Sequence, residues 1–184
     1  MPSSLRVLVV YAHAAPHRSR INRRLAQAAR DVAGVHVQDL YETYPDFYID
    51  AAREQRLVEQ ADTVAFVHPL RWYGVPALLK EWFDVVLEPG WAYGRDSTAL
   101  RGKRYWQAVT TGSPADAYRA GAIHGRPFSD FLAPFEQTAA LCGMQWLAPL
   151  VFHGADSAGE DAIDAHVEAF RLRLAQLASP GSLE

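Results

Sequence analysis

Two side chains suited to moving protons, Tyr118 and His124, lie close together in one non-periodic stretch of the chain. A tyrosine can donate its phenolic proton, and a histidine changes its charge close to neutral pH. The stretch, residues 111–126, directly follows an apolar run that we expect to be a strand. Such a pair favours a proton relay beside a ligand, and the alternative is that both residues only shape the loop.

The residues just before this pair carry hydroxyl groups around a glycine. Thr110, Thr111 and Ser113 flank Gly112. Because glycine has no side chain, the backbone at Gly112 can approach a ligand closely. Hydroxyl and backbone N–H groups at this point can hydrogen-bond the polar edge of a heterocycle.

A basic segment near the N-terminus is a candidate phosphate site. Ser19 is typical of a helix cap, and we expect a helix over residues 20–33. The start of a helix favours anions through its free N–H groups and its dipole. Asn22 adds a donor, and Arg18 and Arg20 add positive charge. The alternative is a capped helix with solvated arginines.

An aromatic loop is the third candidate binding segment. Residues 64–67 are apolar and β-branched, which indicates a buried strand, and His-Pro at 68–69 is expected to stop it. A helix is expected over residues 76–87. Between strand and helix, Trp72 and Tyr73 can offer rings and backbone N–H groups to a flat heterocycle. The alternative is that both rings are ordinary packing groups.

Composition argues against several classes of function. Eighteen basic and 21 acidic residues give a net charge of -3, so the chain has no basic footprint for nucleic acid. The histidines are scattered without HExxH or paired CxxC, so we expect no metal site. The absence of GxGxxG and of a Walker lysine motif disfavours a classical nicotinamide site and a nucleotide-hydrolysing loop. Cys142, the single cysteine, fits a reducing compartment, and we expect a cytoplasmic protein without a signal peptide or transmembrane segment.

The three candidate segments need a scaffold that brings them together. The predicted strands cover residues 6–12, 35–40, 64–67, 105–110 and 145–153, the last interrupted by Pro149. The predicted helices cover residues 20–33, 51–60, 76–87, 127–142 and 157–177. This alternation predicts an α/β, doubly wound parallel sheet in three layers, in one domain over residues 1–184 with a frayed tail at 179–184. The loops after the first, third and fourth strands then meet at one end of the sheet, where ligands bind.

Six segments also occur in a characteristic order: YAH, SRIN, LYETYPDFYID, HPLRWYGVPALLKEWFD, GWAYG and TTG. In this order they resemble the flavodoxin-like NAD(P)H:quinone oxidoreductase family over nearly the whole chain. They look most like its short bacterial branch, the KefF/KefG-type ancillary proteins of glutathione-gated potassium efflux. The resemblance implies a flavodoxin-like three-layer fold with a five-stranded parallel sheet.

The resemblance also implies that three loops bind flavin mononucleotide (FMN). The residues expected at its phosphate and ribityl chain are His13, Ser19, Arg20, Ile21 and Asn22. Those expected to line the isoalloxazine are Leu70, Arg71, Trp72 and Tyr73. Those expected at its pyrimidine edge are Thr110, Thr111, Gly112 and Ser113. Tyr118 and His124 match the tyrosine and histidine that the larger quinone reductases use beside the flavin.

Two positions depart from the family pattern. Ala14 stands where a proline is usual, and Ser113 stands where a second glycine is common. The second departure bears on the loop expected to hold the pyrimidine edge. The chain stops shortly after its last predicted helix, so we expect FMN in preference to FAD, since little sequence is left to embrace an adenosine.

We therefore expect a flavin-dependent NAD(P)H dehydrogenase that reduces quinones by two-electron ping-pong hydride transfer. One alternative is a cytoplasmic regulatory flavoprotein subunit of a potassium efflux antiporter, which would place it at the inner membrane face; a further alternative is an azo- or nitroreductase. The resemblance implies a homodimer. An exposed aromatic patch usually marks an interface, so we expect Trp91 and Tyr93 to reach over the partner's flavin. The alternative is that both rings pack on their own subunit.

Overall fold

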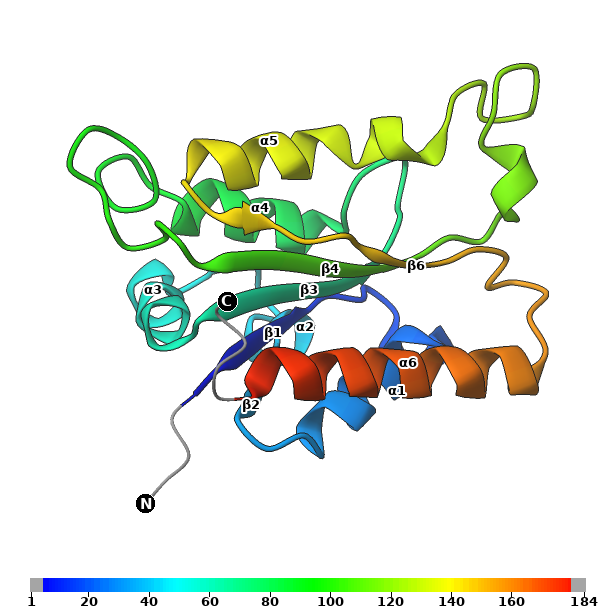
Figure 1. Ribbon diagram of the computed structural model, residues 1–184, viewed down its shortest axis with the longest axis horizontal. Coiled ribbons are helices and arrows are strands. Elements are labelled where there is room, and N and C mark those ends of the chain that lie inside the picture. Colours follow the sequence, from blue (N-terminus) through cyan, green and yellow to red (C-terminus); the bar gives the residue numbers. More distant parts are fainter. Residues whose placement is uncertain (1–4, 180–184) are drawn as a thin grey trace.

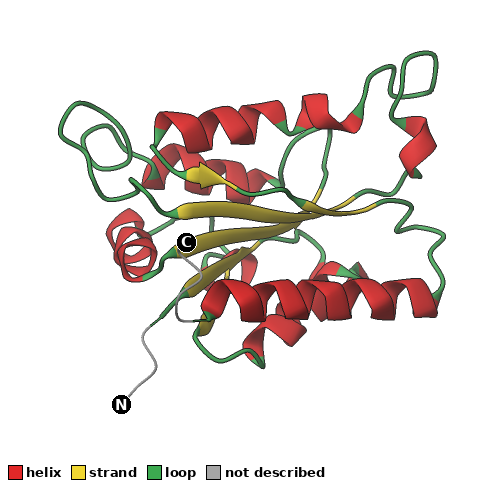
Figure 2. Ribbon diagram, in the orientation of Figure 1, coloured by secondary structure: helices red, strands yellow, loops and turns green. Residues whose placement is uncertain are grey.

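The computed structural model describes residues 5–179 and has a parallel sheet between two layers of helices (Figures 1 and 2). The strand order is β2-β1-β3-β4-β5, with β6 also paired to β4, and every pair is parallel. The strands are β1 (Val7–Tyr11), β2 (Val35–Asp39), β3 (Thr63–Pro69), β4 (Arg104–Thr110), β5 (Gln145–Trp146) and β6 (Leu150–Phe152). The α-helices are α1 (Asn22–Arg30), α2 (Leu40–Thr43), α3 (Ala51–Gln60), α4 (Ala77–Val86), α5 (Ala133–Leu141) and α6 (Glu160–Ala178). This arrangement confirms the predicted flavodoxin-like α/β fold.

The two faces of the sheet bury different helices because side chains alternate along each strand. In β1, Val7 and Val9 face the core beneath α1 and α6. Leu8 and Val10 face the opposite core, beneath α3, α4 and α5. Figure 1 shows α1 and α6 on one side of the sheet and α4 and α5 on the other. Because all the strands are parallel, their carboxyl ends lie at one edge of the sheet, and the loops that follow the strands are brought together there.

The predicted fifth strand is split by Pro149 as expected. Proline has no N–H to offer the ladder, so β5 ends before it and β6 begins after it. Both short strands pair with β4. The indole Nε1 of Trp106 donates to the Ala148 carbonyl at 3.1 Å and bridges the break. The fifth position of the sheet is thus filled by two strands in succession.

The prediction that His68-Pro69 stops the third strand was wrong, because β3 runs through Pro69. Val67 directs its carbonyl toward β1, where it accepts from Ala12. Pro69 has the same orientation, and β1 has already ended at that level. The missing N–H of the proline therefore costs no ladder hydrogen bond. The strand continues until Leu70 donates to the Thr110 carbonyl at 2.8 Å.

The first helix begins at Asn22, two residues later than predicted, because the 3₁₀-helix η1 (Pro16–Arg18) occupies the preceding turn. Ser19 still serves the helix start, since its Oγ accepts from the backbone N–H of Arg23 at 3.1 Å. Asp50 caps α3 as predicted and accepts from the Arg53 N–H at 2.9 Å.

Other boundaries also differ from the predictions. The short helix α2 was not predicted, because one helical turn carries no periodic signal. The predicted helix over residues 127–142 is a 3₁₀-helix, η3 (Phe128–Phe131), followed by α5. Pro134 explains the break, because it cannot donate into a preceding turn. Of the predicted tail, Ser179 donates its hydroxyl to the Ala175 carbonyl, and residues 180–184 lie outside the described residues.

A buried carboxylate joins the sheet edge to two helices. Glu54 is fully buried and accepts from Gln38 Nε2 at 2.6 Å, from the Tyr44 hydroxyl at 2.6 Å and from Trp82 Nε1 at 2.9 Å. These donors belong to β2, to the end of α2 and to α4. A buried carboxylate needs such donors to offset the loss of water. The cluster fixes the helical layer on the α3–α4 face.

Candidate functional site

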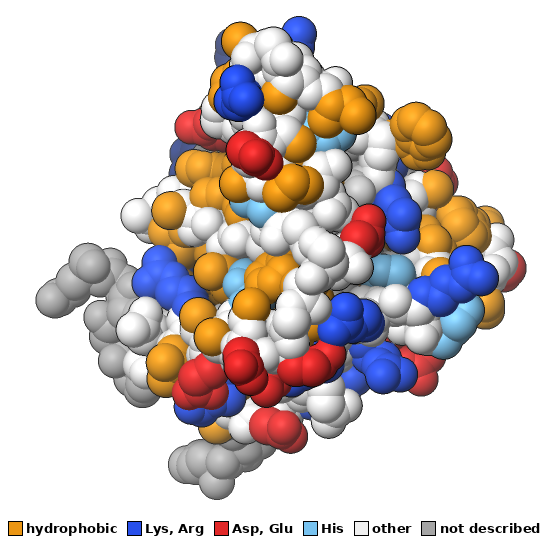
Figure 3. Space-filling view, turned by 90° about the vertical axis from the view of Figure 1, so that its right-hand side faces the viewer, with side chains coloured by type: hydrophobic (Ala, Val, Ile, Leu, Met, Phe, Trp, Pro, Cys, Tyr) orange, Lys and Arg blue, Asp and Glu red, His pale blue; other side chains and the backbone are white. Residues whose placement is uncertain are grey.

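Two adjoining hollows lie at the carboxyl edge of the sheet, the face turned to the viewer in Figure 3. The first has a volume of about 380 Å³ and lies among the loops after β1, β3 and β4. The second has a volume of about 200 Å³ and lies beside the aromatic loop. Leu70, Gly112 and Asp156 line both hollows and form their common border. The three loops predicted to meet at this edge therefore do so.

The first hollow is built around the start of α1. The backbone N–H groups of Arg20, Ile21 and Asn22 have no hydrogen-bond partner among residues 5–179. Such groups, together with the helix dipole, make a site for an anion. Ser19 and Arg18 line the same hollow. All five residues predicted for the phosphate and ribityl chain border this hollow.

Asn22 connects the first loop to the third. Its Nδ2 donates to Thr110 Oγ1 at 2.7 Å in a buried hydrogen bond. Its Oδ1 is buried without a partner among the described residues. A buried acceptor of this kind normally has a donor. A hydroxyl-bearing ligand in the first hollow would supply one.

His13 is buried and lines the first hollow. Its Nδ1 accepts the backbone N–H of Ala15 at 3.1 Å. Burial, and then the nearby charge of Arg71, lower the pKa of His13. The neutral ring therefore carries its proton on Nε2, because Nδ1 is already used as an acceptor.

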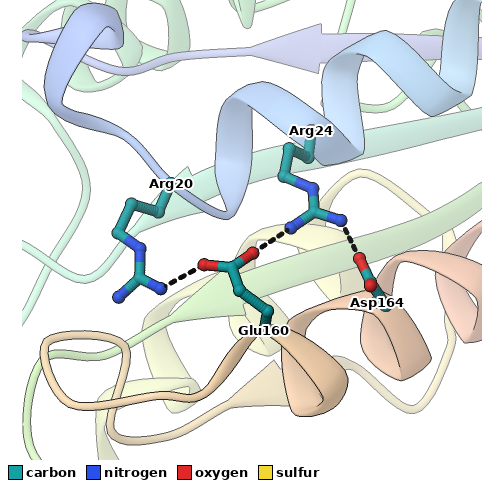
Figure 4. Close-up of polar contacts among 4 residues, drawn as sticks. All are labelled: Arg20, Arg24, Glu160 and Asp164. Atoms are coloured by element: carbon teal, nitrogen blue, oxygen red, sulfur yellow. Dashed lines mark hydrogen bonds and ion pairs between the residues drawn. The ribbon is translucent and has the colours of Figure 1, made fainter.

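Arg20 borders the first hollow but is tied to the last helix (Figure 4). Its Nη2 contacts Glu160 Oε1 at 2.5 Å. Arg24 bonds the same glutamate at 3.0 Å and also pairs with Asp164. These exposed ion pairs join α1 to α6. The Arg20 guanidinium, which is expected to bind a phosphate, is thus already paired with the carboxylate of Glu160 beside the hollow.

The aromatic loop is a tight turn held by its ends. Arg71 and Gly74 exchange two backbone hydrogen bonds of 2.9 Å. Trp72 and Tyr73, between them, have φ values of +49° and +66°. Non-glycine residues rarely adopt this left-handed conformation, and strain of this kind is found at ligand sites. The backbone N–H groups of both residues have no partner within the described part of the chain.

The four residues predicted to line the isoalloxazine divide between the hollows. Leu70 and Arg71 border the first, and Leu70, Trp72 and Tyr73 border the second. The Trp72 side chain is 96% exposed. Tyr73 is stacked on Phe131, with ring centroids 5.1 Å apart. One aromatic ring of the turn is therefore packed and the other is free to meet a ligand or a partner.

The loop after β4 shows why a glycine is needed in its centre. A Cβ at Gly112 would lie 2.5 Å from Asp156 Oδ2. The carboxylate thus covers the backbone at Gly112, on the border of both hollows. Thr110 borders the first hollow and Ser113 the second. Thr111 borders neither; its hydroxyl donates to the Ser113 carbonyl at 2.8 Å and meets His153 Nδ1 at 2.9 Å.

Tyr118 and His124 are brought together, but not as a hydrogen-bonded pair. Their rings are stacked, with centroids 4.3 Å apart and planes at 20°. His124 Nε2 instead lies 2.9 Å from Ser113 Oγ. The His153 ring is tilted against the Tyr118 ring, with centroids 5.3 Å apart, and burial lowers the pKa of His153. Tyr118 and His124 both line the second hollow.

Trp91 and Tyr93 line neither hollow. They belong to the long loop between α4 and β4, which lies at the opposite end of the sheet (Figure 1). Trp91 Nε1 donates to Glu59 Oε1 at 2.8 Å, and both rings pack partly against the core. Within one subunit they are remote from the candidate site.

Sequence reasoning missed Asp156, which borders both hollows. It follows β6, so it also lies at the carboxyl edge of the sheet. A signal for it was present in the sequence, because the loop after the fifth predicted strand ends at the same edge of a parallel sheet as the other three. Among residues 5–179, no group of three or more His, Cys, Asp or Glu side chains could hold a metal ion. None of the helices described is both long and apolar enough to cross a membrane.

The donor set of the first hollow fits the phosphate and ribityl chain of FMN. Free amides and basic side chains are the groups that bind phosphate. The orphaned oxygen of Asn22 and the carboxylate of Asp156 are acceptors suited to hydroxyl groups. The adjoining aromatic-walled hollow is suited to a flat ring.

Comparison with known proteins agrees with this fit. A family described by its flavodoxin-like fold (Flavodoxin_2) matches residues 5–177. The glutathione-regulated potassium-efflux system ancillary protein KefG of Enterobacter sp. (strain 638) is 44% identical over 171 residues, covering 92% of this chain and 93% of KefG.

Three solved structures are also similar. General stress protein 14 of Treponema denticola in complex with FMN is 34% identical, with a TM-score of 0.88 over 94% of this chain and 99% of that one. A structure named as a thermophilic tryptophan halogenase from Streptomycin violaceusniger is 40% identical, with a TM-score of 0.85 over 90% and 95%. An NADPH-quinone reductase from P. pentosaceus is 30% identical, with a TM-score of 0.82 over 95% and 98%. The names of these proteins differ while the fold and length agree, and the chain belongs to the Flavodoxin_2 family of flavodoxin-like fold.

Proposed function

We propose that this protein is an FMN-dependent NAD(P)H:quinone oxidoreductase. The observation that carries the proposal is the pair of adjoining hollows at the carboxyl edge of the sheet. One has the donors that a phosphate needs, and the other has aromatic walls that suit a flat ring. The similarity to an FMN complex and to an NADPH-quinone reductase supports the same assignment.

The chain's own residues would bind and orient the cofactor. The amides at the start of α1, with Ser19, Arg18 and His13, would hold the phosphate. The free N–H groups of Trp72 and Tyr73 would meet the ring. When bound, a flavin supplies hydride transfer between a nicotinamide and an electron-poor acceptor.

The nicotinamide and the acceptor would stack in turn on the face of the bound ring that the second hollow leaves open. Use of one face by both partners is the reason for proposing ping-pong kinetics. Tyr118, at the wall of the second hollow, would stabilise charge that develops at the polar edge of the flavin, and His124 would hold the Tyr118 ring by stacking. Quinones are the acceptors proposed first, and azo or nitro aromatics would fit the same walls.

A homodimer would complete the site. Trp91 and Tyr93 are partly exposed aromatics remote from their own subunit's hollows, and aromatic residues are enriched in interfaces. In the proposed dimer they would cover the partner's second hollow. Light scattering that shows a fully active monomer at micromolar concentration would contradict this arrangement.

A second candidate function is regulatory. The 44% identity to KefG favours a role as an ancillary subunit of a potassium-efflux system, with the protein in the cytoplasm beside the membrane. Both roles can coexist in one flavoprotein. Co-purification of the tagged chain with an antiporter from its own host would support the second role, and potassium efflux unaffected by its deletion would count against it.

The enzymatic proposal is tested on purified protein supplied with FMN or FAD and then dialysed. We expect retained FMN absorbance, release of the mononucleotide on denaturation, and oxidation of NADH or NADPH that depends on added quinone. A protein that retains neither flavin would contradict the proposal.

A further inference from the structure

Ser113 is held in the candidate site by both its backbone and its side chain. Its carbonyl accepts from Thr111 Oγ1 at 2.8 Å and from the Gly154 N–H at 2.9 Å. Its Oγ lies 2.9 Å from His124 Nε2. Ser113 is therefore held to the loop after β6 through its carbonyl and to His124 through its hydroxyl, while it lines the second hollow.

The direction of the Ser113–His124 hydrogen bond follows from the other nitrogen of the ring. His124 Nδ1 is buried and has no partner among the described residues. A neutral imidazole carries one proton, and placing it on Nδ1 would bury an N–H donor without an acceptor. A proton on Nε2 is more favourable, because Nε2 then donates to Ser113 Oγ. The hydroxyl proton of Ser113 consequently remains free.

The Ser113 hydroxyl can donate its proton into the second hollow. Ser113 Oγ donates to no residue in the described part of the chain, and the space it borders is the second hollow, with Trp72, Tyr73 and Tyr118 around it. It does not line the first hollow, where the phosphate donors lie. A donor fixed at the wall of a space that binds a ring can hydrogen-bond an oxygen at the edge of that ring.

We propose that the Ser113 hydroxyl is a catalytic hydrogen-bond donor to a carbonyl oxygen of the electron acceptor, with His124 as its positioning residue. This inference rests on the proposed oxidoreductase function. It specifies that the electron acceptor of that enzyme is a ring that bears a carbonyl group. As a quinone takes up hydride from the reduced flavin, negative charge develops on its carbonyl oxygen, and a prepositioned donor stabilises that charge. A proton from water then completes the hydroquinone.

The inference also gives a meaning to the departure at this position. A glycine, which is common here in the resembling family, would keep the backbone contacts and lose the hydroxyl. It would also leave His124 Nε2 without its partner. The serine hydroxyl therefore acts on the electron acceptor and is not needed to bind the cofactor.

The test compares Ser113→Ala, Ser113→Gly and Ser113→Thr in FMN-loaded protein, with Ser129→Ala as the matched control. Ser129 is an exposed serine that lines neither hollow. Reoxidation of the reduced protein is followed by stopped flow with a benzoquinone and, separately, with ferricyanide, which has no carbonyl oxygen. We expect Ser113→Ala and Ser113→Gly to slow quinone reduction about tenfold, the effect of one neutral hydrogen bond. Reoxidation by ferricyanide and flavin occupancy should stay unchanged, and Ser113→Thr should restore the quinone rate.

A readout independent of turnover tests the His124 link. In ¹⁵N-labelled full-length protein, the His124 Nε2–H should give an exchange-protected NMR signal that is lost in Ser113→Ala and kept in Ser129→Ala. Loss of that signal with an unchanged quinone rate would overturn the catalytic role and leave only the hydrogen bond. Equal slowing with both acceptors would place the hydroxyl on the cofactor and overturn the proposal. Wild-type protein that binds FMN but reduces no quinone would overturn the parent function, whatever the NMR result.

Discussion

Tyr118 and His124 lie face to face, with ring centroids 4.3 Å apart and planes at 20°, while the imidazole Nε2 bonds to Ser113. The histidine therefore holds the tyrosine ring by stacking and spends its hydrogen bond elsewhere. The sequence had suggested a relay in which the histidine backs the phenol. With this stacked geometry, we expect Tyr118 to act on flavin reduction and His124 to act on quinone reduction through Ser113.

Tyr118→Phe should slow flavin reduction by NAD(P)H while leaving flavin occupancy intact. The phenylalanine keeps the stack and removes only the donor, which helps most when charge develops on the flavin. Because the backbone N–H of Gly112 can carry part of that charge, we expect a loss of about 100-fold or less. Stopped-flow reduction with occupancy measured alongside tests this, and His124→Ala should act mainly on the quinone step. Unchanged rates in both variants at full occupancy would reduce the two residues to loop structure.

Glu160→Gln should strengthen FMN binding. The substitution removes a negative charge beside the first hollow and releases Arg20 toward the phosphate. The pair is exposed, so we expect only about a two- to fivefold lower Kd, roughly 0.4–1 kcal/mol, and less at high salt. Asp164→Asn is the matched control, because it loses an ion pair with Arg24, which lines neither hollow. Fluorescence titration showing equal or weaker FMN binding in Glu160→Gln would contradict the shared-arginine arrangement.

His68 should make the fold sensitive to acid. It is 1% exposed, and burial lowers its pKa from 6.5 to about 4. The unfolded chain therefore binds the proton first as pH falls, so stability is full above pH 6.5 and is lost as pH falls toward 4. Between pH 7 and pH 5 this amounts to about 2 kcal/mol.

Urea unfolding of His68→Gln at these two pH values measures that contribution. The variant should lose about 2 kcal/mol less than wild type between pH 7 and pH 5, since all the other histidines are unchanged. His17→Gln, at an exposed position, should behave as wild type. An acid loss in His68→Gln equal to that of wild type would show that His68 is not buried in its neutral form.

Trp82→Phe should destabilise the fold by about 1–3 kcal/mol, because a buried oxygen of Glu54 loses its donor. Trp91→Phe is the matched control: its indole also donates to a glutamate, but that glutamate, Glu59, is exposed, and water can replace the donor. Denaturation of both variants by urea measures the difference. Equal, small losses would mean that the Glu54 cluster does not hold the helical layer.

The scaffold was predictable because its signals are local and strong. Continuous apolar strands with helices between them leave few arrangements, and parallel strands bring their following loops to one edge. The phosphate segment, the aromatic loop and the segment around Gly112 were all located in this way. The site residues named from sequence all border one of the two hollows at the carboxyl edge, except Thr111, Trp91 and Tyr93.

The remaining features depend on contacts that sequence does not display. The left-handed turn at Trp72 and Tyr73 goes against the preferences of both residue types. Arg20 meets Glu160 only because α1 and α6 lie side by side on one face of the sheet. Asp156 follows a strand that Pro149 interrupts, so its loop carried a weaker signal than the other three.

One measurement tests the central claim most directly: an anaerobic absorbance titration of the FMN-loaded protein. Adding NADH or NADPH should bleach the flavin band with two electrons per site, and one equivalent of a benzoquinone should then restore it. A bound flavin that neither nicotinamide can bleach, or a bleached flavin that the quinone fails to reoxidise, would contradict an NAD(P)H:quinone oxidoreductase at this site.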